Sequence, residues 1–88
     1  MPHMITGAAA RAIAYDWASV MTWNDPGVAL YGFASTGRVQ SEAHRADCAT
    51  YVRRRLEWVA TDKRRGATTA GRRLRALLRY ILNTPVEG

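Results

Sequence analysis

Residues 63–82 carry the strongest periodic pattern in this chain: a basic cluster, a Gly/Thr break, and a segment with an apolar side and an arginine side. The apolar positions recur at helical spacing and share one side of a helical wheel; they are Ala70, Leu74, Leu77, Leu78 and Ile81. Arg72, Arg75 and Arg79 fall on the opposite side. Because the leucines need cover while the arginines face outward, the pattern predicts one wall of a small core with a positive ridge on its surface.

Length and composition indicate a single folded domain. A chain of 88 residues is short for two ordinary domains, and its 48% hydrophobic content argues against general disorder. The single cysteine excludes an internal disulfide. No apolar run approaches the roughly 18 to 20 residues of a membrane span, and no basic region followed by an apolar one opens the chain. We therefore expect a cytoplasmic protein without a membrane span.

Start and stop signals divide the chain into four helices, expected at about 6–23, 26–36, 42–63 and 69–83. Thr6 and Ser41 are candidate N-caps of the first and third helices, because a side-chain oxygen can accept hydrogen bonds from the free amides of a first turn. Gly37 is the expected stop of the second helix, and Thr68 or Thr69 is the expected cap of the last. The sequence thus predicts an all-α fold, a small single-domain bundle of four helices, one of them short.

The second predicted helix has a competing assignment as a strand. Residues 26–36 are apolar on nearly every side, so we expect this segment to be buried and central. A strand is the alternative, because periodicity cannot type so short a run. Gly32 and the Asp25-Pro26 entry favour a helix.

One connection and both chain ends are expected to lie outside the core. They are residues 38–40, a linker; residues 85–88, a frayed tail; and residues 1–4, a disordered start whose first three residues are consistent with a cloning remnant. The expected core consists of Ile13, Trp17, Val20, Leu30, Phe33, Val52, Leu56, Val59, Leu74, Leu77, Leu78 and Ile81.

The net charge of +6 is concentrated in the second half of the chain. Residues 53–79 carry ten Lys/Arg against two Asp/Glu, a net charge of +8, and the remaining residues together carry −2. Such asymmetry indicates a polyanionic partner, either nucleic acid, an anionic membrane surface or an acidic protein surface. The alternative is that the arginines only solubilise the helices.

His44 and Cys48 come nearest to a chemical motif, because they stand four residues apart on the third predicted helix. A zinc site needs two further ligands at suitable spacing, and the chain offers no recognisable set. A nucleophile and base would need a third residue to orient the histidine. Neither the acidic residues nor the glycines match an acid–base pair or a phosphate loop. We expect no metal, no cofactor and no enzymatic activity.

Three other uses of the basic half compete with simple phosphate contact. Residues 66–74, GATTAGRRL, have the order of a turn and recognition helix in a helix-turn-helix, but the polar turn at 61–65 and Gly71 count against it. The last helix also has the pattern of a basic amphipathic segment on anionic lipid, although the core needs its leucines. An apolar stripe wider than its neighbours can cover would instead form a homodimer seam.

The sequence favours a small non-enzymatic module that binds a polyanion, with nucleic acid held through its phosphates as the favoured ligand. The alternative is a protein-binding adaptor or inhibitor, of the phage or mobile-element accessory type, whose arginines pair with carboxylates of a nucleic-acid-handling complex. The candidate polyanion-binding residues are Lys63, Arg64, Arg65, Arg72, Arg75 and Arg79.

Overall fold

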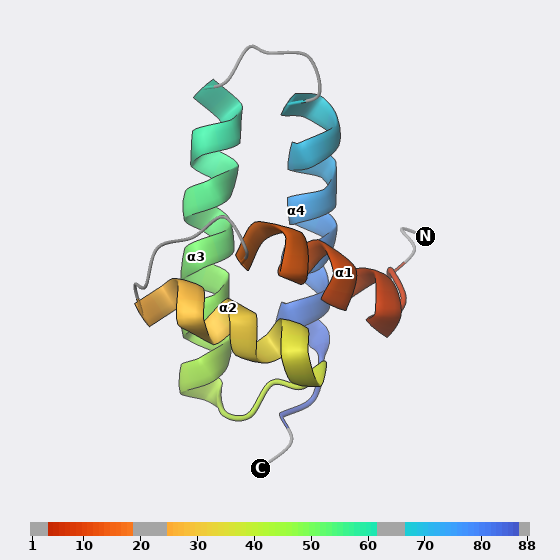
Figure 1. Ribbon diagram of the computed structural model, residues 1–88, viewed down its shortest axis with the longest axis vertical. Helices are drawn as coiled ribbons and strands as arrows, with labels where there is room; N and C mark the ends of the chain where they lie inside the picture. Colours follow the sequence, from red (N-terminus) through yellow and green to blue (C-terminus); the bar gives the residue numbers. More distant parts are fainter. Residues whose placement is uncertain (1–3, 19–24, 62–66, 87–88) are drawn as a thin grey trace.

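Four helices make up most of the chain in the computed structural model, which describes residues 4–18, 25–61 and 67–86. They are α1 (Gly7–Ala18), α2 (Asp25–Thr36), α3 (Glu42–Thr61) and α4 (Ala67–Asn83) (Figure 1). The predicted all-α class and the number of helices are confirmed. The predicted ends of the first and third helices, near residues 23 and 63, lie outside the described residues.

The helices form two layers. α3 and α4 run side by side in opposite directions, and α1 and α2 lie across one face of that pair (Figure 1). α2 packs against α3, while α1 packs against both α2 and α4. The molecule measures 40 × 36 × 18 Å, and the short dimension corresponds to two stacked helices. With one face of the α3–α4 pair covered by the other described helices, the outer side of α4 remains exposed.

Three of the predicted capping residues bound helices as expected. The Ala9 amide donates to Thr6 Oγ1 (3.1 Å), and the His44 amide donates to Ser41 Oγ (3.0 Å). Gly37 ends α2 with a φ of 74°, in the left-handed region that glycine adopts without strain. These local signals therefore set three helix boundaries.

The start of α4 differs from the prediction. The helix begins at Ala67, so Thr68 and Thr69 lie inside its first turn and neither is the cap. Alanine is the strongest helix former, and threonine costs only a few tenths of a kcal/mol more in a helix. The residue types at 67–69 therefore allow the helix to start at Ala67, two residues before the predicted start.

The core lies between the two layers and contains most of the predicted residues. Leu30, Phe33, Val52, Val59, Leu74, Leu77 and Ile81 are buried, Ile13, Trp17, Leu56 and Leu78 are partly buried, and Val20 lies outside the described residues. α1 contributes mainly small side chains, because its buried residues are Ala10, Ala14 and Ala18. Without long side chains on that face, α1 can approach its neighbours closely.

The predicted linker and tail are wrong at two residues. Val39 is fully buried, and it pairs with Val86 in an isolated parallel β-bridge. Val86 itself packs against the core. The connection from α2 to α3 and the end of the chain thus lie side by side and close the lower end of the molecule (Figure 1).

The expectation that residues 26–36 are buried and central is confirmed only in part. Leu30, Phe33 and Ala34 are buried, but Val28 and Tyr31 are each 48% exposed. α2 belongs to the outer of two layers, where it contacts α1 and α3, and the side that carries Val28 and Tyr31 faces solvent.

Candidate anion-binding surface

α4 shows the predicted division between apolar and basic sides. Leu74, Leu77 and Ile81 have no exposed surface. Arg72 and Arg79, together with Arg75 between them, are exposed. We call Arg72, Arg75 and Arg79 the arginine ridge.

The arginine ridge is a nearly straight line of cations. Its members are three and four residues apart, so they occupy successive turns on one side of the helix and span about 10 Å along the axis. Met4 and Ala76 join the three arginines around a shallow depression of about 230 Å³. Met4 was expected to belong to a disordered start, but it lies beside α4 at this depression.

None of the ridge guanidinium groups is neutralised by a carboxylate of the described residues. α4 contains no Asp or Glu, so no partner exists at the i±3 or i±4 positions of the same helix. The ion pair that the structure shows between described residues, Arg45 with Glu42, lies on α3. The ridge therefore keeps its positive charge at the surface.

The other predicted members of the site, Lys63, Arg64 and Arg65, lie outside the described residues. The structure brings together Arg72, Arg75 and Arg79, and these three are the part of the predicted site that it describes.

Three other arginines serve the fold. Arg11 caps the end of α2 by donating to the carbonyls of Ala34 (3.0 Å) and Ser35 (2.9 Å). Arg55 stacks over the Tyr51 ring, with 5.1 Å from the guanidinium carbon to the ring centroid. Arg55 follows Tyr51 by one helical turn, so the two side chains lie on the same side of α3.

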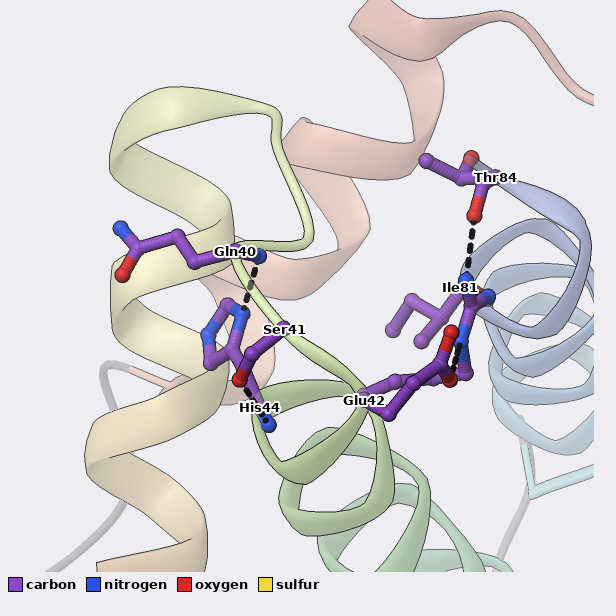
Figure 2. Close-up of polar contacts among 7 residues, drawn as sticks. Gln40, Ser41, Glu42, His44, Ile81 and Thr84 are labelled. Carbon is purple, nitrogen blue, oxygen red and sulfur yellow. Dashed lines mark hydrogen bonds and ion pairs between the residues drawn. The ribbon is translucent and has the colours of Figure 1, made fainter. Parts of the chain in front are cut away.

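Arg45 caps α4 from α3. Its guanidinium donates to the carbonyls of Ile81 and Thr84 (2.7 Å) and pairs with Glu42 at 2.9 Å. Figure 2 shows Glu42 close to Ile81 and Thr84, at the end of α4. The caps by Arg11 and Arg45 escaped prediction, because their partners lie 23 to 39 residues away and local spacing carries no such signal.

His44 is held by two backbone groups and is not available as a ligand or base. The Gln40 amide donates to Nδ1 at 3.1 Å (Figure 2). Nε2 lies 2.9 Å from the Ala29 carbonyl, which can only accept. These two contacts assign the ring N–H donor to Nε2. Because that nitrogen already donates to Ala29, it has no lone pair to offer Cys48 Sγ at 3.7 Å.

Cys48 is a core residue. Its side chain is fully buried, and burial raises the pKa of the thiol to about 12, with a further contribution from the Asp47 carboxylate. A thiol with this pKa is not a nucleophile or a metal ligand at neutral pH. Among the described residues no group of three or more His, Cys, Asp or Glu could hold a metal ion.

The arrangement of α3 and α4 does not match a helix-turn-helix. The two helices of that motif cross at a steep angle, so that the second can enter a groove. Here α4 lies alongside α3 over most of its length (Figure 1). Gly71 is buried against Val59 of α3, so the start of α4 forms part of the contact between the two helices.

No helix within residues 4–18, 25–61 and 67–86 has both the length and the apolar character needed to cross a membrane. No protein family, curated protein or solved structure matches this chain.

Proposed function

We propose that this protein is a non-enzymatic cytoplasmic module that binds nucleic acid through phosphate contacts. The observation that carries the proposal is the arginine ridge, Arg72, Arg75 and Arg79, exposed along one line and unpaired among the described residues. Guanidinium groups are strong phosphate ligands, because each can donate two parallel hydrogen bonds to one phosphate.

The dimensions of the arginine ridge suit a nucleic-acid backbone. Three guanidinium groups in a line about 10 Å long can each contact a phosphate of one strand. The depression between Met4 and the ridge is shallow and has no acidic lining residue. Such a surface contacts the backbone without reading bases, so binding should depend strongly on salt and weakly on sequence.

Charge removal on the ridge tests the proposal. Arg72→Ala, Arg75→Ala and Arg79→Ala should each weaken duplex DNA or RNA binding for all sequences alike and reduce the salt slope by about one. Alanine has the highest helix propensity, so α4 should remain folded in each variant. Fluorescence anisotropy with a labelled duplex at several salt concentrations measures both quantities.

Arg53→Ala is the matched control, since Arg53 is also exposed on a helix but lies on α3, away from the ridge. It removes the same charge and should change binding less than any ridge variant. Equal effects of Arg53→Ala and the ridge variants would show non-specific attraction to the whole charge of the protein, and would contradict a defined site.

A protein-binding adaptor is the second candidate, favoured by an exposed aromatic pair on the outer layer. Tyr15 of α1 and Tyr31 of α2 are 52% and 48% exposed, with ring centroids 5.9 Å apart, and Val28 beside them is 48% exposed. Tyrosine is enriched at the centres of protein interfaces. Failure of the wild-type protein to bind any nucleic acid at low salt would favour this candidate, in which Tyr15→Ala and Tyr31→Ala should weaken capture of the partner from host extract.

A homodimer remains a prediction. Leu82, on α4, is 42% exposed, and Leu78 is only partly buried. The apolar stripe of α4 is thus not fully covered by the other described helices, the condition under which it would form a seam between two copies. Light scattering during size-exclusion chromatography would decide between monomer and dimer.

A further inference from the structure

A second cluster of aromatic and basic side chains, distinct from the arginine ridge, joins the last turn of α1 to α3. Trp17 and Trp58 meet edge to face, with ring centroids 6.4 Å apart and planes at 81°. Arg55 lies between Tyr51 and Trp58, with 5.1 Å and 6.0 Å from its guanidinium carbon to the two ring centroids.

Hydrogen bonds hold the base of this cluster rigidly. Arg55 Nε donates to the Tyr51 hydroxyl (3.1 Å), and that hydroxyl donates to the Trp17 carbonyl (3.1 Å). Tyr51 is only 6% exposed, whereas Trp58 is 49% exposed. The cluster therefore presents one large indole to solvent from a support that is already ordered. Binding of a ligand there would cost the protein little side-chain entropy.

Two arginines of α3 lie near the exposed indole. Arg54 is exposed and stands one helical turn before Trp58, on the same side of α3. Arg55 lies against the indole itself. The nearest carboxylate in sequence, Glu57, is adjacent to Trp58 and so points about 100° away around the helix.

An unpaired nucleobase fits both properties of this surface. A base offers a flat face to an aromatic ring, and stacking on an exposed aromatic is a sequence-tolerant way of holding a single strand. The phosphate next to that base brings the negative charge that Arg54 and Arg55 complement. An apolar side chain of a partner protein would use the indole but would leave the two arginines without a counter-charge.

We propose that Trp58 is a stacking platform for an unpaired base of a nucleic-acid strand, with Arg54 contacting the neighbouring phosphate. The proposal rests on the proposed function for the identity of the ligand, but it uses a different surface. Trp58 and Arg72 are chain neighbours of Val59 and Gly71, which meet between α3 and α4. The platform and the arginine ridge therefore belong to the same end of the α3–α4 pair.

Binding of matched single-stranded and double-stranded probes tests the platform. The probes are a fluorescein-labelled thymidine oligonucleotide of about 20 nucleotides, longer than the site of a typical single-strand binding module, and a duplex of the same length. Trp58→Leu should weaken single-strand binding about fivefold or more, the loss expected for one stacked base, and should leave duplex binding unchanged. Arg53→Ala is the control, since Arg53 is exposed on the same helix, and it should change single-strand and duplex binding alike.

A conservative variant keeps the test decisive if Trp58→Leu does not fold, as judged by circular dichroism. Trp58→Phe retains an aromatic face, so it should still bind the single strand, but it should lose most of the tryptophan quenching that the wild-type protein shows on binding. Unchanged quenching in Trp58→Phe would overturn the proposal. So would equal single-strand affinities of wild-type protein and folded Trp58→Leu, or equal losses on single strand and duplex.

The proposed function and the platform can fail separately. Duplex binding that depends on Arg72, Arg75 and Arg79, combined with no effect of Trp58→Leu on the single strand, removes the platform and leaves the proposed function. No binding of the wild-type protein to either probe at low salt removes both.

Discussion

Arg11 and Arg45 each use a guanidinium group to close the carbonyl end of a helix other than their own. The last carbonyls of a helix have no partner within it, and a cation there also complements the negative end of the helix dipole. Arg45 is the more buried of the two, with 16% of its side-chain surface exposed. At the scale of single residues, these contacts separate arginines that stabilise the fold from arginines available to a ligand.

Arg45→Ala should lower the free energy of unfolding by about 2 kcal/mol, because it leaves the carbonyls of Ile81 and Thr84 without this partner. Urea denaturation followed by circular dichroism measures the change. Arg53→Ala removes an exposed arginine from the same helix and should have little effect on stability. Similar losses in the two variants would contradict the capping role of Arg45.

The Cys48 thiol should be inert in the folded protein. Because burial raises its pKa to about 12 from an ordinary 9.0, it should not react with a disulfide reagent at pH 8 until denaturant unfolds the chain. The same shift links stability to pH. Above pH 9 the unfolded state loses the thiol proton while the folded state keeps it, so stability should fall as pH rises toward 12.

Cys48→Ala removes the thiol and is therefore the control. The unfolding free energies of this variant and of the wild-type protein are compared across the same pH range. The wild-type protein should lose more stability between pH 9 and 12. Parallel curves, or rapid thiol labelling of the native protein, would show that Cys48 is not protected as the structure indicates.

At the scale of helices, the strongest local signals of the chain are its caps and its leucine spacing. The caps set the starts of α1 and α3 and the end of α2 as expected, and the leucine spacing set the buried side of α4. At the end of α2, the local glycine signal at Gly37 is joined by a tertiary contact with Arg11. Gly37 has a φ of 74°, and a Cβ added there would lie 2.9 Å from Cδ of Arg11. The position therefore requires glycine both for its backbone angle and for the side chain that caps α2.

Gly37→Ala should lower stability by about 1 to 2 kcal/mol, from the left-handed backbone alone and before any displacement of Arg11. Gly32→Ala is the matched control within the same helix, since the nearest atom to its added Cβ, Nε2 of His44, lies at an ordinary 3.7 Å. That variant should be neutral or slightly stabilising, because alanine is the better helix former. Thermal unfolding of both variants checks the difference, and an equal loss in the two would be contrary to this account.

At the scale of the whole molecule, a two-layer arrangement leaves each helix with an outer side that the other described helices do not cover. This explains why α2 is half-exposed although its residues are nearly all apolar, and why the arginine ridge of α4 can face solvent. It also explains the role of Val39 and Val86, which bring the α2–α3 connection against the end of the chain. A segment without helical periodicity thus closes the core.

Val39→Ala should destabilise the protein by about 2 kcal/mol, since it removes two fully buried methyl groups and leaves a cavity. Val28→Ala deletes the same atoms at a position that is 48% exposed and should have a much smaller effect. Chemical denaturation of the two variants compares them directly. If Val39→Ala proved as mild as Val28→Ala, the connection would not belong to the core.

The sequence by itself determined the helical class, most of the core and the side of α4 that carries Arg72, Arg75 and Arg79. Spacing and capping act within a few residues, so a linear chain already contains them. Only the tertiary structure decided that Arg45 is a cap, that Val39 is buried and that Trp58 stands exposed beside Trp17 and Arg55. The cap by Arg45 depends on contacts with residues 36 or more positions away. The burial of Val39 and the exposure of Trp58 depend on how the two layers pack against each other.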